Sequence, residues 1–205
     1  MTANIYEVSG RWLRVVSDDF FGPCVHSPNG RFTLAWDNAR VETGDAGIAR
    51  RGRFLLLEAG RIRVRGDMRT ALTGCVSDAG TFLIGCGPKR AHRQEGTVYV
   101  ISPRGKALIK HRINALLGAS AISDDHCYAA CQATTSDADN ADRGRLHFFD
   151  LKDRCLLWKK RVETGWATRY EFDTLGRVLL AYCGPDGRDG CCRYAFDGTC
   201  LDSEK

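Results

Sequence analysis

One unit recurs four times along this chain of 205 residues and constrains its fold more than any other feature. Each copy is a short apolar segment, a tight polar turn and then a more strongly apolar strand. The turns begin at residues 27, 77, 123 and 173, so one copy follows the next after 46 to 50 residues. An internal period of this size indicates stacked units that share one continuous core.

A second hairpin follows each unit, at residues 52–65, 97–110, 145–159 and 192–201. Runs of β-branched and aromatic residues between Gly, Asp and Ser turns predict strands, and no segment sustains a helical period. Each period therefore holds four predicted antiparallel strands. A single sheet of this kind cannot cover both its faces, so we expect neighbouring sheets to stack as the blades of a β-propeller.

The pattern of apolar residues in a strand indicates whether that strand lies in the middle of a blade or at its outer edge. Residues 98–101 are apolar at consecutive positions, which suits a strand buried on both sides. Residues 61–65 instead alternate strictly, as expected of an exposed outer edge. The arginines aligned there, Arg61, Arg63, Arg65 and Arg69, are explained equally well as edge charges or as a polyanion-binding row.

The segment from Leu146 to Lys159 and the order Ser-Asp-x-Gly, Gly-Thr-Val-Tyr-Val-Ile-Ser, Pro-Arg-Gly-Lys-Ala-Leu-Ile-Lys resemble repeats of the quinoprotein-like and WD-repeat propeller superfamily. The resemblance implies an all-β fold of about four four-stranded blades, and it carries over no activity. We expect a single domain, 1–205. It divides into an extra outer hairpin (1–18) and blades at 19–70, 71–114, 115–164 and 165–205.

The N-terminal hairpin, residues 4–8 and 11–16, looks like the outer half of a blade whose inner half is missing. Five outer hairpins and four inner ones fit neither a simple closed four-blade ring nor five complete blades. The hairpin could decorate a closed ring, complete a blade in another subunit, or belong to an incomplete propeller with an exposed flank. An uncovered apolar flank would call for a homo-oligomer or a stable complex.

Composition and the chain start favour a cytoplasmic protein. The first residues show neither the basic start nor the apolar stretch of a secretory signal, and no apolar run is long enough to span a bilayer. Ten cysteines are many, but most lie in apolar runs, where reduced thiols act as small buried hydrophobes. Disulfides and metal ligation are the alternatives. The formal charge of +5 gives weak support for a polyanion partner.

Loops between the second and third strands of each blade, together with the links between blades, form the face where partner contacts are expected. These loops cover residues 37–51, 87–95, 132–143 and 184–190. The candidate partner-binding residues are Lys89, Arg90, His92, Arg93, Asp137, Asp139, Asp142 and Arg188. Because basic and acidic loops alternate, a uniform nucleic-acid face is not indicated.

No set of residues amounts to an active site, and we expect no cofactor. The acidic loop 137–142 lacks the closing glutamate of a calcium loop. Cys127 and Cys131 lie four positions apart on a predicted strand, about 13 Å, which is too far for one zinc ion. No phosphate loop, nucleophile elbow or zinc-protease motif is present. The pattern leans away from an enzyme and from a metal site.

Three functions fit these sequence features. The first is a non-catalytic interaction or scaffold module that binds another protein, or a second copy of itself, through loops or an open flank. The second is a small-molecule enzyme or sensor at the mouth of the central channel, which would need room there. The residues expected on the innermost strands, and so able to fill that channel, are Val25, Val76, Ile122 and Phe172. The third is a nucleic-acid-binding accessory protein.

Overall fold

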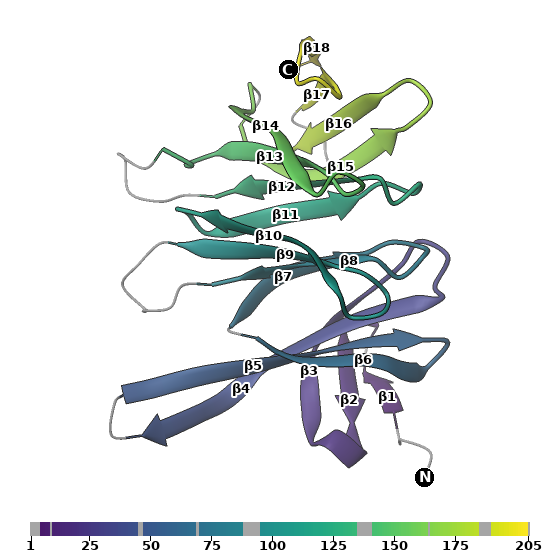
Figure 1. Cartoon of the computed structure of the whole chain (residues 1–205), viewed down its shortest axis with the longest axis vertical. Coiled ribbons are helices and arrows are strands. Elements are labelled where there is room, and N and C mark those ends of the chain that lie inside the picture. The colour runs from purple at the N-terminus through teal and green to yellow at the C-terminus, as the bar shows by residue number, and fades with distance from the viewer. Residues whose placement is uncertain are drawn as a thin grey trace.

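The computed structural model describes residues 5–8, 10–44, 47–68, 70–87, 95–134, 141–163, 165–184 and 190–204. Within these ranges the chain is all-β, with strands β1 to β18, one short 3₁₀ helix and no α-helix. The sheets are stacked one on another, with the N-terminus at one end of the stack and the C-terminus at the other (Figure 1). No helix in the described part of the chain is long and apolar enough to cross a membrane.

Three of the four repeats form separate four-stranded antiparallel sheets in simple chain order, as the repeat predicts. Blade 2 consists of β7 (Ala71–Val76), β8 (Phe82–Cys86), β9 (Gly96–Ile101) and β10 (Ala107–Ile113). Blade 3 consists of β11 (Leu117–Ile122), β12 (Tyr128–Ala133), β13 (Arg145–Asp150) and β14 (Cys155–Arg161). Blade 4 consists of β15 (Ala167–Asp173), β16 (Val178–Cys183), β17 (Gly190–Ala195) and β18 (Cys200–Glu204).

The first repeat belongs to a sheet of six strands in the order β1 to β6. These are β1 (Ile5–Val8), β2 (Trp12–Val15), β3 (Phe20–His26), β4 (Phe32–Gly44), β5 (Gly47–Glu58) and β6 (Arg61–Met68), with the 3₁₀ turn Val16–Asp18 between β2 and β3. Strand β3 pairs with two different strands. Residues 20–23 pair with β2, and residues 24–26 pair with β4 as the inner strand of blade 1. The predicted N-terminal hairpin is thus present, and it continues the sheet of blade 1.

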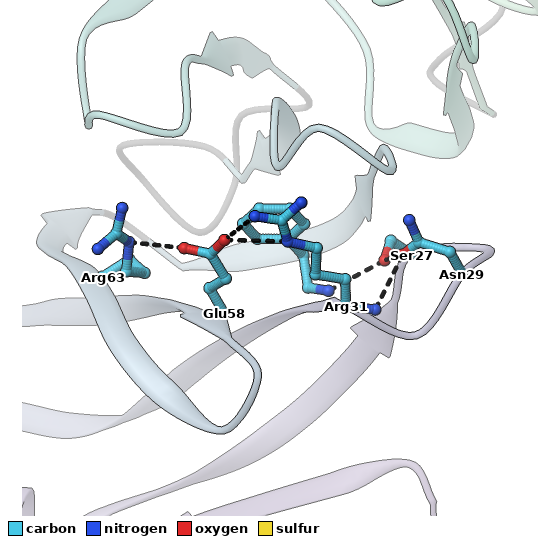
Figure 2. A network of polar contacts seen from close by, with 6 residues as sticks. Ser27, Asn29, Arg31, Glu58 and Arg63 are labelled. Carbon is cyan, nitrogen blue, oxygen red and sulfur yellow. Dashed lines mark hydrogen bonds and ion pairs between the residues drawn. The ribbon is translucent and has the colours of Figure 1, made fainter.

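The inner turns of the repeat are held by side chains at fixed positions. In blade 1, the Ser27 hydroxyl donates to Asn29 Oδ1 at 2.9 Å, and the same oxygen accepts the backbone N–H of Arg31 at 2.9 Å. Figure 2 shows this turn beside Arg31, which contacts Glu58, while Arg63 contacts Glu58 from the other side. Blade 3 repeats the arrangement, with Ser123 donating to Asp125 Oδ1 at 2.6 Å. A serine recurs at the start of these turns because its hydroxyl forms hydrogen bonds within the turn.

Residues 37–51, expected as a loop, instead extend β4 and β5 into a long hairpin. The pairing resumes after a bulge between Asp37 and Arg40 and continues to Gly44 opposite Gly47. This hairpin projects away from the stack at the lower left of Figure 1. The sequence of residues 37–51 has no sustained alternation of apolar and polar residues from which these strands could be predicted.

Apolar cores lie between successive sheets. Blades 1 and 2 share Leu34, Leu56, Phe82 and Ile84, among others. Further clusters join blades 2 and 3 and blades 3 and 4. Each inner blade is covered on both faces, which explains the nearly continuous apolar strands.

The N-terminal strands cover the outer face of blade 1. Leu13, Val15 and Phe20 pack there against a cluster that includes Leu55 and Leu57. Gly22 allows the close approach, since a Cβ atom at this position would lie 1.8 Å from the carbonyl oxygen of Trp36. Residues 5–23 therefore form an end cap on blade 1, which we call the N-terminal cap.

The far face of blade 4 carries ion pairs around the partly buried Leu180. Its described side chains form two ion pairs, Arg169 with Glu171 at 3.2 Å and Arg193 with Asp202 at 3.0 Å. The Arg169 guanidinium also lies over the Tyr182 ring at 4.3 Å. Among the described strands, blade 1 has no contact with blade 4 as extensive as those between successive blades. The stack is therefore an open arc. The N-terminal cap covers one of its ends, and ion pairs lie on the other.

Candidate binding groove

The inner strands of all four blades surround one hollow of about 480 Å³ on the concave side of the arc. Its floor receives one apolar side chain from the equivalent position of each repeat: Val25, Val76, Ile122 and Phe172. These are the four residues that the sequence places on the innermost strands. Because the arc is open, they line a groove instead of filling a closed channel.

The groove opens toward the inner-hairpin turns, since Pro28 and Asp124 of those turns belong to its lining. In an antiparallel blade, the loops between second and third strands lie at the other end of the strands. The groove and the predicted loop face are thus at opposite ends of the blades.

The charged side chains of the groove are acidic. Asp124 and Glu171 belong to its lining together with His26, and no lysine or arginine does among the described residues. This contrasts with the net charge of +5 on the whole chain. Glu171 also accepts a hydrogen bond from the Tyr182 hydroxyl at 3.0 Å. Because Glu171 is also paired with Arg169 at 3.2 Å, the negative charge of the lining comes mainly from Asp124. Together with the apolar side chains, it favours ligands that are cationic and partly apolar.

Cys75 is the nucleophilic side chain of the lining. Burial raises the pKa of its thiol to about 11, against the opposing effect of the Ser120 hydroxyl. A nucleophilic cysteine needs a thiolate near neutral pH, and this environment disfavours one. The described part of the groove is therefore better suited to binding than to cysteine chemistry.

The wall of the groove at β15 is fixed by the buried side chain of Gln132, on β12. Its Oε1 accepts the hydroxyl of Tyr170 at 3.0 Å and the N–H of Ala167 at 2.8 Å. Its Nε2 donates to the carbonyls of Gly144 and Gly165 at 3.1 and 3.0 Å. Burial raises the pKa of Tyr170 well above its usual value, so its hydroxyl stays a donor. Gln132 thereby joins blade 3 to blade 4 beside the groove.

Of the eight predicted partner-binding residues, one lies within the described residues. Asp142 is 4% exposed, and its carboxylate accepts Lys159 Nζ at 2.8 Å and the N–H of Asn114 at 3.0 Å. Burial pulls the pKa of Asp142 upward, but these hydrogen bonds hold it below its usual value. Asp142 thus connects blade 3 to the link from blade 2. The other seven, Lys89, Arg90, His92, Arg93, Asp137, Asp139 and Arg188, lie outside the described residues.

The ten cysteines form no disulfide, and half of them are buried, as expected for thiols that act as small hydrophobes. Cys155 differs: its sequence neighbours are apolar, but the thiol is exposed on the outer edge strand β14. Cys192 is buried and Cys191 only partly so, because adjacent side chains of a strand point to opposite faces of the sheet. Within the described residues, no three His, Cys, Asp or Glu side chains are placed to hold a metal ion.

Comparisons with known proteins identify the fold. No family model and no curated protein matches this sequence. Among solved structures, "Crystal structure of HIRA(644-1017)" matches with a TM-score of 0.58 and 12% sequence identity, covering 86% of this chain and 50% of that one. The chain spans about half the length of that neighbour. At this identity the likeness shows the fold alone, a propeller-like arrangement of four-stranded blades.

Proposed function

We propose that this chain is a non-catalytic protein-interaction module, one domain of residues 1–205, whose concave groove holds a segment of another protein. The groove carries this proposal because all four blades contribute to its apolar floor. A hollow of about 480 Å³ has room for a few side chains of a partner. Propeller-type folds in general present such surfaces for partners.

The charged side chains that line the groove indicate which kind of partner segment it would bind. Glu171 is already paired with Arg169, so Asp124 supplies most of the negative charge of the described lining, which favours a segment that combines Lys or Arg with aliphatic residues. The same charges oppose a polyanion in this place, which argues against nucleic acid as its occupant.

We retain two further parts of the proposal. The seven loop residues at the other end of the blades (Lys89, Arg90, His92, Arg93, Asp137, Asp139 and Arg188) are proposed as a second set of partner contacts. A cytoplasmic location is proposed because most of the cysteines lie in apolar runs of the sequence, where reduced thiols act as small buried hydrophobes.

A matched pair of variants tests the groove. Asp124 and Asp153 are both exposed turn residues of blade 3, but only Asp124 lines the groove. The immobilised chain is used to capture proteins from a lysate of its source organism, with cross-linking mass spectrometry to locate the contact. We expect a partner that cross-links near the groove, that binds the Asp153→Arg variant normally, and that binds Asp124→Arg at least tenfold more weakly by calorimetry.

Three outcomes would contradict the proposal. Equal affinity of the two variants would remove the groove as the binding site. Capture that disappears after nuclease treatment would identify a nucleic-acid ligand instead. The absence of any saturable partner would reject the interaction function itself.

A further inference from the structure

Two histidines meet at the joint between blades 2 and 3. His147 on β13 is 0% exposed, and His111 on β10 is partly buried. Their ring centroids lie 5.3 Å apart with an interplanar angle of 58°. The His111 ring also meets Phe149 edge-on at 5.3 Å. The pair therefore lies within the apolar contact that holds the two blades together.

Neither ring nitrogen of His147 has a hydrogen-bond partner within the described residues. Buried polar groups are paired in the great majority of cases, so an unpaired imidazole at the centre of an interface is unusual. A neutral ring is tolerated there, whereas an imidazolium would require solvation or a counter-charge.

The charged and titratable groups around His147 offer no free counter-charge among the described residues. The groups from the neighbouring elements are Cys131 on β12, Lys159 on β14, Arg145 on its own strand, His111 on β10 and Asp142 in the turn before β13. Asp142 is already bound to Lys159 and to the Asn114 N–H. The remaining groups are cationic, become cationic on protonation, or are a buried neutral thiol. A proton on His147 therefore meets more positive charge than negative.

We propose that the His111–His147 pair makes the joint between blades 2 and 3 an acid-sensitive opening point of the stack. Protonation of the buried ring favours states in which the two blades separate and water reaches the imidazole. Separation at this joint uncovers the apolar cluster between the blades, including Val98, Val100 and Phe149. Acidification would thus expose apolar surface at one defined place while blades 3 and 4 stay packed.

The direction of the pH effect follows from the histidine pKa values. Burial, and secondly His111, lowers the pKa of His147 to about 4, and burial also lowers the pKa of His111. A folded pKa below the unfolded value of about 6.5 means that the folded state prefers the neutral ring. This contribution to stability is complete above about pH 6.5 and is lost as the pH falls toward 4.

Hydrogen-exchange mass spectrometry of the whole chain at pH 7.5 and 5.0, corrected for intrinsic exchange rates, tests the joint. For opening linked to His147, we expect protection in β10 and β13 to fall about 30-fold relative to β16, from the shift between roughly 6.5 and 4. The His147→Phe variant keeps ring volume without a titrating nitrogen and should lose this difference. His26→Phe, at an exposed histidine, should keep it.

A second measurement needs no variant. In an NMR titration of the five histidines of the wild-type chain, one buried imidazole should titrate well below pH 6.5. Titration of His147 near 6.5, or equal protection of β10 and β13 at the two pH values, would overturn the proposal. If His147→Phe does not fold, His111→Phe replaces it. Because burial of His147 is the larger cause, His111→Phe should keep most of the pH difference, and its complete loss would also overturn the proposal.

Discussion

At the scale of single residues, the buried polar side chains hold the blades to one another. Gln132 makes four hydrogen bonds that reach the β12–β13 loop, the link between blades and strand β15. An apolar core between two sheets is tolerant of small sliding movements, whereas a hydrogen-bonded amide specifies one position. Gln132 therefore sets where blade 4 lies relative to blade 3, and with it the wall of the groove.

We predict that Gln132→Leu destabilises the fold by about 3 kcal/mol, because it leaves two backbone carbonyls, one N–H and a tyrosine hydroxyl without their partner. Tyr170→Phe removes one of the four bonds and should cost only about 1 kcal/mol. Urea unfolding of both variants measures the difference. Equal losses for the two substitutions would show that Gln132 has no special role in joining the blades.

At the scale of elements, two arginines of blade 1 contact the N-terminal cap: Arg65 pairs with the Asp18 carboxylate at 3.0 Å at the surface, and Arg53 makes the more buried contacts. Arg53 on β5 donates to the carbonyls of Asp18 and Asp19 at 2.8 and 2.7 Å and pairs with the carboxylate of Asp37. Its guanidinium also lies 5.5 Å from the Phe20 ring centroid. Asp37 is only 2% exposed, so this ion pair is shielded from solvent. The cap is therefore held within its own chain.

We predict that Arg53→Met costs about 2–3 kcal/mol, since it leaves the buried carboxylate of Asp37 without its guanidinium. Loosening of the cap should appear as faster hydrogen exchange in β2 and in residues 20–23. Arg63→Met is the control, because Arg63 pairs with Glu58 at the surface and such pairs contribute about 0–1 kcal/mol. A cap that exchanges at the wild-type rate in Arg53→Met would disprove this role of the arginine.

The local sequence pattern predicted the individual strands and turns better than it predicted how the blades and the N-terminal hairpin pack together. The inner turns and their strands follow from a serine or aspartate at the turn start and from apolar runs, which are properties of short segments. The destination of the N-terminal hairpin depends on Arg53, some 35 residues away from Asp18, and on the close contact allowed by Gly22. The groove depends on whether the arc closes, which the packing angles between blades decide. Neither the position of the N-terminal hairpin nor the closure of the arc can be inferred from the repeated sequence pattern.

At the scale of the whole molecule, the two ends of the arc replace the neighbours that a closed ring would supply. The N-terminal cap covers the apolar face of blade 1, and the far face of blade 4 carries the ion pairs of Arg169 and Arg193. Terminal units with a polar outer face are how repeat proteins end without aggregating. Within the described residues the apolar face of blade 1 is therefore covered, and the exposed apolar surface at that end is limited to side chains of the cap such as Trp12 and Phe21.

At this scale we predict that the chain is a monomer in solution. Light scattering coupled to size-exclusion chromatography at micromolar concentration should give the chain mass of 22.7 kDa. The apolar face of blade 1 is covered by the cap, the far face of blade 4 carries ion pairs, and the rings that the cap exposes, Trp12 and Phe21, stack on each other as a small patch. The Arg53→Met variant provides the contrast: as its cap loosens and the face with Leu55 and Leu57 becomes accessible, concentration-dependent association should appear. A wild-type chain that elutes with twice the monomer mass would mean that these ends meet another copy after all. The arc would then be half of a ring completed between two chains.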